Sequence, residues 1–253
     1  MHRKFPQGKI FELPSFFASL KPDLVLMGGD FTTTSLPAEY ALGLKFTKML
    51  PAPWLAIPGN HDHYTFRAYR QKHFYKWLTN KREVHHRTGF FNLKEHGVEA
   101  HKIAPKWWVV ALDTARPTLT TARGLFSPKQ EERLLELLSF IPKDASILLF
   151  NHYPFFQNDI YQHNLERGEA LEQVVRNDLR IKAYLHGHTH RHIIADLQLS
   201  GLPVILDSGC CADKNGTWNL LTFDDHGMKV DVYKYKTLSH SREIAWTRGL
   251  TRG

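Results

Sequence analysis

Cysteine is scarce in this chain: its 253 residues contain two, Cys210 and Cys211, and these are adjacent. The sequence therefore excludes the disulfide framework of a small secreted protein. No apolar run approaches the ~20 residues that a membrane-spanning helix needs. The first six residues also lack the apolar segment of a secretory signal. These absences predict a cytoplasmic protein without an integral membrane segment.

Acidic residues are outnumbered by basic ones, 25 against 33, which gives a formal net charge of +8. A positive surface suits anionic partners in general, although an ordinary solvated surface explains the charge equally well. The Lys and Arg residues are scattered, and no aromatic-plus-basic platform is present on which single-stranded nucleic acid could stack. The composition therefore favours a phosphorylated small-molecule or lipid-linked substrate over nucleic acid.

Linkers, repeats and low-complexity segments are absent as well, and the length suffices for one α/β domain with a sizeable core. Apolar runs predict strands that alternate with amphipathic helices up to residue 190. The predicted strands are 23–27, 53–57, 107–112, 146–150 and 181–185, and the predicted helices are 13–20, 37–49, 166–176 and one that starts at 127–128. Residues 191–253 predict an antiparallel meander with strands at 193–199, 203–207, 217–223 and 228–235.

Polar residues follow all five strands predicted in the first half; Asp113 follows the third, and the other four strands end in short motifs. Each motif alone is typical of an ordinary turn. Their ordered combination instead predicts a metal centre, because loops converge at the carboxyl ends of strands and supply oxygen and imidazole ligands for divalent cations. The motifs, in chain order, are Gly28-Gly29-Asp30, Gly59-Asn60-His61-Asp62, Asn151-His152 and His186-Gly187-His188-Thr189-His190.

The spacing within these motifs fits the same interpretation. His188 and His190 are two residues apart, so in extended backbone their side chains point the same way. Gly187 lets the chain come close to an ion without a Cβ in the way. Asp30 is the carboxylate suited to bridge two cations at the ~3.5–4 Å separation that two-metal hydrolysis uses.

Together the motifs resemble those of the calcineurin-like metallophosphoesterase superfamily, and within it the bacterial cyclic-nucleotide and phosphodiester hydrolase branch. The resemblance runs from about Leu24 to His190, and the β-rich tail matches the second sheet of the family. It implies a single domain, 1–253, built as a four-layer α/β/β/α sandwich of two mixed sheets. Residues 1–190 would form the metal-site half and residues 191–253 the second-sheet half.

The resemblance also implies the roles of the site residues. Two metal ions (Mn, Fe or Zn) would be bound by Asp30 as the bridge, by Asn60, His152 and His188 at the second metal, and by His190 at the first. His61 would stabilise or protonate the leaving oxygen, and Asp62 would help to orient His61. The implied reaction is hydrolysis of a phosphoester, with a diester favoured, by a metal-bridging hydroxide.

One expected piece is missing. The first strand of the family ends in Asp-x-His, which supplies two further ligands to the first metal, and residues 1–29 contain no such motif. We expect that the first strand is missing because the chain starts too late, which leaves the first metal with Asp30 and His190. The alternative is a natural one-metal or degenerate protein of the same fold, weakly active or a non-catalytic scaffold.

Other functions and residues stay open. A nuclease is one further alternative, and a lipid-linked pyrophosphatase is another. Asp113 either binds a ligand histidine or caps its strand, and His186 faces either toward or away from the site. Cys210 and Cys211 are expected as small buried residues, with approach to a metal as the alternative. An apolar rim for a lipid is conceivable, although such aromatic residues are more often core: Trp77, Phe90, Phe91, Trp107 and Trp108.

Overall fold

A seven-stranded mixed sheet, in the order β10-β11-β9-β7-β5-β4-β3, forms the centre of the molecule. The computed structural model describes residues 7–78, 87–88, 91–117, 121–157, 160–213 and 216–248. Strands β5, β7, β9 and β11 run parallel to one another, while β10, β4 and β3 run antiparallel to their neighbours. The strands are β3 (Arg87–Thr88), β4 (Val98–Lys102), β5 (Trp107–Leu112), β7 (Ser146–Phe150), β9 (Ile181–His186), β10 (His192–Asp196) and β11 (Val204–Ser208).

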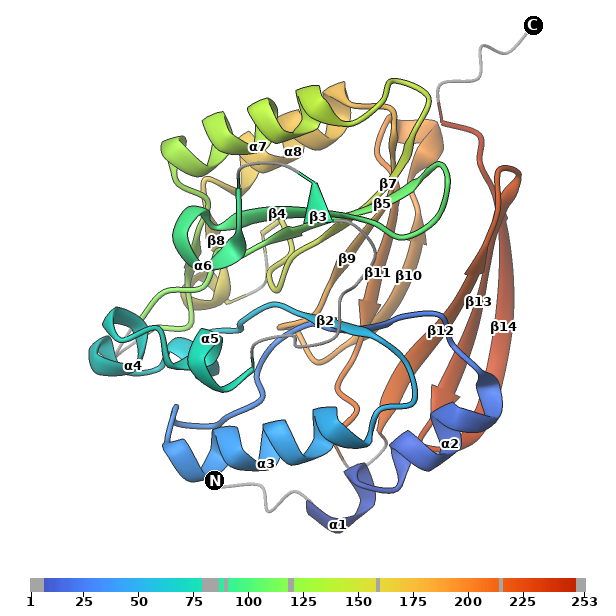
Figure 1. Cartoon of the computed structure of the whole chain (residues 1–253). Coiled ribbons are helices and arrows are strands. Elements are labelled where there is room, and N and C mark those ends of the chain that lie inside the picture. The colour runs from blue at the N-terminus through green and yellow to red at the C-terminus, as the bar shows by residue number, and fades with distance from the viewer. Residues whose placement is uncertain are drawn as a thin grey trace, which may run out of the picture.

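Two helices, α7 (Pro128–Phe140) and α8 (Gly168–Asn177), cover one face of this sheet (Figure 1). Helix α7 begins where its sequence signal predicts, because the Ser127 hydroxyl accepts a hydrogen bond from the Gln130 backbone N–H at 3.2 Å. Alternate residues of β5 point to opposite faces, as the strand repeat of two requires. Trp108, Val110 and Leu112 accordingly pack in the core under the helices.

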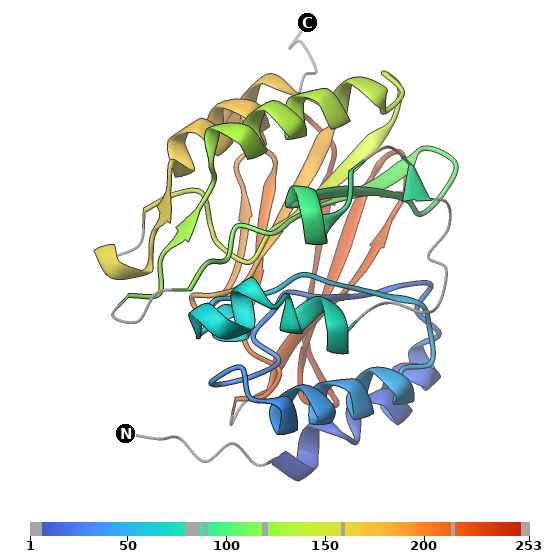
Figure 2. The same ribbon diagram turned by 60° about the vertical axis from the view of Figure 1, so that its left-hand side comes forward.

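The other face of the sheet packs on a second β layer, with further helices outside it (Figure 2). This layer holds β1 (Val25–Met27), β2 (Trp54–Ala56), β12 (Thr217–Phe223), β13 (Gly227–Lys234) and β14 (Thr237–Ala245). The outer helices are α1 (Gln7–Ile10), α2 (Leu13–Leu20) and α3 (Pro37–Met49). The connections contain three short helices, α4 (Phe66–Arg70), α5 (His73–Trp77) and α6 (Leu93–His96). They also contain the paired strands β6 (Gly124–Leu125) and β8 (Leu165–Glu166). Three 3₁₀ turns complete them: η1 (His61–His63), η2 (Tyr161–His163) and η3 (Gln198–Ser200). The layers confirm the predicted sandwich.

Two expectations about this sandwich need correction. The second layer is not one sheet, because β1–β2 is a separate parallel pair and β12–β13–β14 a separate antiparallel sheet. In the described part of the chain, β1 and β12 each pair along one edge only, so no strand joins the two pieces. The division at residue 190 does not follow the sheets either. Strands β10 and β11 extend the central sheet, where the parallel pairing of β11 with β9 buries their apolar residues.

The aromatic residues considered for a rim are packed into the interior where the structure describes them. Trp107 and Trp108 are 5% and 4% exposed and lie on opposite faces of the central sheet. Trp77 and Phe91 pack against two of the cores, and Phe90 lies outside the described residues. Within the described ranges, no helix combines the length and apolar character needed to cross a bilayer.

Arg248 anchors the C-terminal segment to α8 through hydrogen bonds, and these bonds lead to a stability prediction. Its buried guanidinium donates hydrogen bonds to the backbone carbonyls of Val175, Arg176 and Ile181 near the C-terminal end of the helix. We expect Arg248→Met to lower the free energy of unfolding by about 2 kcal/mol, because charge-assisted bonds to orphan carbonyls are lost. Urea denaturation measures this loss.

The matched control is Arg242→Met, since the exposed Arg242 donates a single bond, to the Ile194 carbonyl at 2.8 Å. A loss no larger than that of the control would show that the Arg248 contacts add nothing to stability.

Candidate metal centre

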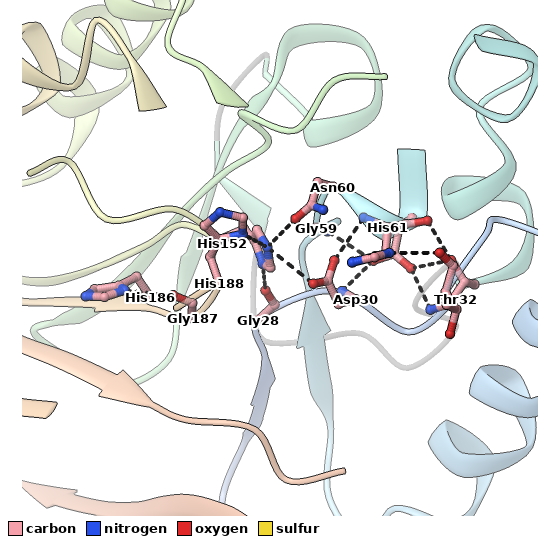
Figure 3. A network of polar contacts seen from close by, with 12 residues as sticks. Gly28, Asp30, Thr32, Gly59, Asn60, His61, His152, His186, Gly187 and His188 are labelled. Carbon is pink, nitrogen blue, oxygen red and sulfur yellow. Dashed lines mark hydrogen bonds and ion pairs between the residues drawn. The ribbon is translucent and has the colours of Figure 1, made fainter. Parts of the chain in front are cut away.

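Four loops meet at one point of the molecule, and they follow β1, β2, β7 and β9 (Figure 3). The first two strands belong to the small parallel pair and the other two to the central sheet. The predicted ligand loops therefore converge from two sheets rather than along the edge of one. They bring together Asp30, Asn60, His152 and His188, which are four of the five predicted metal ligands.

The His152 imidazole is the hub of this cluster. Its Nε2 atom lies 3.2 Å from Asn60 Oδ1, 3.2 Å from His188 Nδ1 and 3.6 Å from Asp30 Oδ2. Its other nitrogen, Nδ1, is 2.6 Å from the Gly28 carbonyl oxygen. A carbonyl oxygen only accepts hydrogen bonds, so the Nδ1–H donates and fixes the ring tautomer.

In the neutral ring, this tautomer places lone pairs against lone pairs. With the proton on Nδ1, the Nε2 atom of His152 is an acceptor, and so are the Asn60 amide oxygen and the Asp30 carboxylate. Burial first, and then the neighbouring His152, lower the pKa of His188 to about 2, so this ring is neutral as a metal ligand must be. A cation among these atoms would satisfy all of them at once.

The spacing of the donor atoms also fits an ion. Two ligand atoms that lie ~2.1 Å from one ion, at angles of about 90–109°, stand ~3.0–3.4 Å apart, close to the 3.2–3.6 Å around His152 Nε2. Among the described residues, no three His, Cys, Asp or Glu side chains form a closed metal-binding set.

The backbone around the cluster is tightly constrained. Asp30, His188 and His190 all have positive φ angles, of 59°, 67° and 55°, which cost energy in residues with a Cβ and are concentrated at functional sites. Gly59 lies directly beneath the ligands. A Cβ added there would stand 2.1 Å from Asp30 Oδ1 and 2.7 Å from His152 Cε1. Close approach of the chain to these two side chains thus requires glycine at position 59, whereas at Gly187, where the sequence predicted such an approach, an added Cβ would meet nothing within 4 Å.

Asp62 is fully buried and supports the Asp30 loop, whereas the prediction had it orient His61. Its Oδ2 accepts hydrogen bonds from the backbone N–H groups of Asp30 at 2.7 Å and Gly59 at 3.0 Å, and its Oδ1 accepts one from Thr32 N at 3.1 Å. Burial first, and then the Asp30 carboxylate, raise its pKa. Asp62 therefore holds the Asp30 turn in place.

His61 is oriented by another group. Its Nδ1 lies 2.8 Å from the Thr33 carbonyl oxygen, to which it donates, and its ring stacks on Tyr64 with centroids 6.1 Å apart. Its Nε2 has no hydrogen bond to a described residue. The half-buried ring thus has one nitrogen anchored and the other available. No sequence signal identified Thr33, because it contributes a backbone carbonyl, which every residue has.

The fifth predicted ligand, His190, forms no hydrogen bond or ion pair with this cluster or with any other described residue. It is exposed. Cys210 is half-buried, and its thiol pKa is raised by burial and, less strongly, by nearby charges that include Asp30. Cys211 is exposed, so the expectation of two buried cysteines is wrong for it.

The structure shows the contacts of Asp113 and His186, whose roles the sequence did not decide. Asp113 accepts a hydrogen bond from the Tyr75 hydroxyl and lies 3.4 Å from Nε2 of the buried His63. It therefore contacts no ligand histidine. His186 points away from the cluster in Figure 3. It lies 3.6 Å from Asp207, and burial lowers its pKa to about 4, so it is a buried structural residue.

Known proteins share this fold and part of this sequence. A probable glycerophosphodiester phosphodiesterase of Arcobacter nitrofigilis is 28% identical over 177 residues, which cover 68% of this chain and 58% of the relative. A 3′,5′-cyclic adenosine monophosphate phosphodiesterase of Escherichia coli K12 is 24% identical over 75% of this chain and 61% of the relative. The chain thus spans less than two thirds of the length of either relative.

The fold is also that of a dimetal phosphatase from Danio rerio, with a TM-score of 0.71 at 13% identity over 95% of this chain and 89% of that one. Residues 2–192, which contain every loop of the cluster, match the sequence model of one family. The chain belongs to the calcineurin-like phosphoesterase family.

Proposed function

We propose that the protein is a metal-dependent phosphoesterase that favours phosphodiesters. The observation that carries this proposal is the meeting of Asn60 Oδ1, Asp30 Oδ2 and His188 Nδ1 around His152 Nε2, an arrangement of four possible ligand atoms that suits a cation. Family membership supports phosphoester hydrolysis, and the two phosphodiesterase relatives support a diester.

The residues of the cluster divide the work among them. Asp30, Asn60, His152 and His188 would hold the metal, with Asp30 and His190 as the ligands available to a second ion. Divalent ions at such a site supply Lewis acidity, which lowers the pKa of water and neutralises charge on the phosphoryl oxygens. His61, anchored through Nδ1 to the Thr33 carbonyl, holds a proton on Nε2 for the departing alkoxide. Asp62 keeps the Asp30 turn in place.

One observation favours a second candidate, a one-metal and weakly active protein. The first metal site has Asp30 and an exposed His190, and no further ligand contacts Asp30 among the described residues. This candidate keeps the reaction and differs in metal content and in rate.

Bound metal and hydrolysis, measured on the same preparation, test the proposal. We expect elemental analysis of chain purified without chelator to find Mn, Fe or Zn, and we expect the protein to hydrolyse bis(p-nitrophenyl) phosphate. Removal of the metal by chelator should abolish hydrolysis, and its return should restore it. About two ions per chain support the dinuclear form, and one ion with slow turnover supports the second candidate. Hydrolysis that survives complete removal of metal would overturn the proposal.

A further inference from the structure

Two arginines converge on one carboxylate oxygen beside the candidate metal centre. Arg116, in the segment after β5, donates to Oε1 of Glu166, and Arg123, just before β6, lies 2.8 Å from the same atom through Nη1. The pairing of β6 with β8 brings Arg123 and Glu166 together, although they are far apart in sequence. We call Arg116 and Arg123 the arginine pair.

The arginine pair carries more charge than its partner neutralises. Two guanidinium cations face one carboxylate, so one positive charge is left over among these three residues. Neither guanidinium has another hydrogen bond to a described residue, and the Nε atoms of both are buried without a partner. The side chains are 29% and 21% exposed, so solvent and ligands reach them. Like charges this close repel each other, and a bound anion would relieve the repulsion.

Three other half-buried arginines that form ion pairs differ in this respect. Arg167 pairs with Glu131, Arg176 with Glu172 and Arg180 with Asp178, each at one cation to one carboxylate. Arg123 is in addition held over the ring of Tyr161, 4.4 Å from its centroid. The arginine pair is thus both positioned and undercompensated, as a built anion site requires.

The arginine pair lies one aromatic ring away from a metal ligand. Gly124, next to Arg123, is packed against Tyr153 so closely that an added Cβ would stand 2.6 Å from Tyr153 Cε2. The Tyr153 ring in turn contacts His188, with centroids 4.5 Å apart. His163, from the turn that contains Tyr161, also contacts His188, at 5.5 Å. Through these contacts, the segment that carries Arg123 lies next to the part of the cluster formed by His188.

We propose that Arg116 and Arg123 bind a second phosphate group of the substrate, beyond the phosphoester that is hydrolysed. Planar guanidinium groups bind phosphate oxygens through paired, charge-assisted hydrogen bonds, which suits this ligand best. The inference rests on the proposed function and narrows its substrate class to phosphodiesters that carry a further phosphate. A cyclic mononucleotide or a simple glycerophosphodiester carries one phosphate only.

Binding of inorganic phosphate to the chelator-treated full chain tests the site without hydrolysis. We expect calorimetry to show saturable binding to the wild type and a loss of about tenfold or more in affinity in Arg123→Gln, since charge-assisted hydrogen bonds are worth roughly 1.5–3 kcal/mol and 1.4 kcal/mol is tenfold. Arg123→Lys, which keeps the charge but not the fork, should fall between the two. The matched control is Arg176→Gln, which removes a one-to-one helix pair and should bind like the wild type. Equal affinity in all four proteins, or no saturable binding to the wild type, would overturn the site.

Hydrolysis of two related esters tests whether the arginine pair binds the substrate. One is the p-nitrophenyl ester of thymidine 5′-monophosphate, and the other is the same ester with a 3′-phosphate. We expect the wild type and Arg176→Gln to prefer the phosphorylated ester in kcat/KM, and Arg123→Gln to lose that preference. An equal ratio in wild type and Arg123→Gln would show that the site does not serve the substrate. Hydrolysis of neither ester would count against the proposed function, while phosphate binding to the metal-free chain would still decide the arginine pair.

Discussion

Asp30→Asn is expected to remove bound metal and phosphodiesterase activity together. The substitution keeps the size of the side chain but replaces a carboxylate by a neutral amide, which brings no negative charge and is a poor bridge between two ions. Oδ2 of Asp30 is the negatively charged member of the cluster around His152, and its Oδ1 accepts a hydrogen bond from His61 N at 3.0 Å. The loss of activity should exceed about 100-fold, because even hydrogen-bond partners of ligands cost about 10–100-fold when removed.

Elemental analysis and hydrolysis of bis(p-nitrophenyl) phosphate measure the two effects on one sample. Asp144→Asn is the matched control, since Asp144 is exposed and precedes β7, at the opposite end of that strand from the His152 loop. This control should keep the metal and activity of the wild type. An Asp30→Asn protein with full metal content would refute the role of Asp30 as the bridging ligand.

His61→Ala is expected to lower kcat by about 10²–10⁴-fold, the usual contribution of a general acid, while metal content stays unchanged. The reason is geometric: the ring is fixed by its bond to the Thr33 carbonyl, and within the described part of the chain its second nitrogen forms no hydrogen bond to His152, Asn60 or His188. The loss should be larger for an alkyl ester than for a p-nitrophenyl ester, because the alkoxide needs a proton more than the nitrophenolate does.

The dependence on the leaving group separates proton donation from a structural role. A variant that merely disturbs the loop should slow both esters equally. His226→Ala, at an exposed turn between β12 and β13, is the control and should behave as the wild type. Equal losses on both esters, or a loss of metal from His61→Ala, would contradict the assignment.

Local sequence signals predicted most of the elements that carry the site. The run Trp107–Leu112 and the run Ile181–His186 became buried strands because their apolar residues fill cores on both faces of the central sheet. Helix α7 was predicted from the capping residue Ser127 and from the helical spacing of its leucines, because both signals lie within the helix's own sequence. Strand β14 was missed, since its mostly exposed residues carry little apolar alternation.

Pairing between distant strands was harder to predict. The strands at 192–196 and 204–208 were assigned to the second layer by their place in the chain, yet they extend the central sheet. Strand identity depends on local pattern, whereas sheet membership depends on which edges meet after folding. The roles of Asp62 and Asp113 changed for the same reason, because their partners, the Asp30 and Gly59 backbone in one case and Tyr75 in the other, come from other loops.

The sequence by itself determined the family and the order of strands and helices in the first 190 residues. It also predicted the four side chains that meet in the cluster, Asp30, Asn60, His152 and His188, because these follow from residue type and from position at strand ends. Only the tertiary structure decided that the ligand loops come from two sheets, that Thr33 holds His61 and Asp62 holds Asp30, and that Arg116 and Arg123 share Glu166. These features depend on backbone carbonyls and on contacts between distant segments. Neither leaves a pattern in the chain, because a carbonyl belongs to every residue and a distant contact has no fixed spacing.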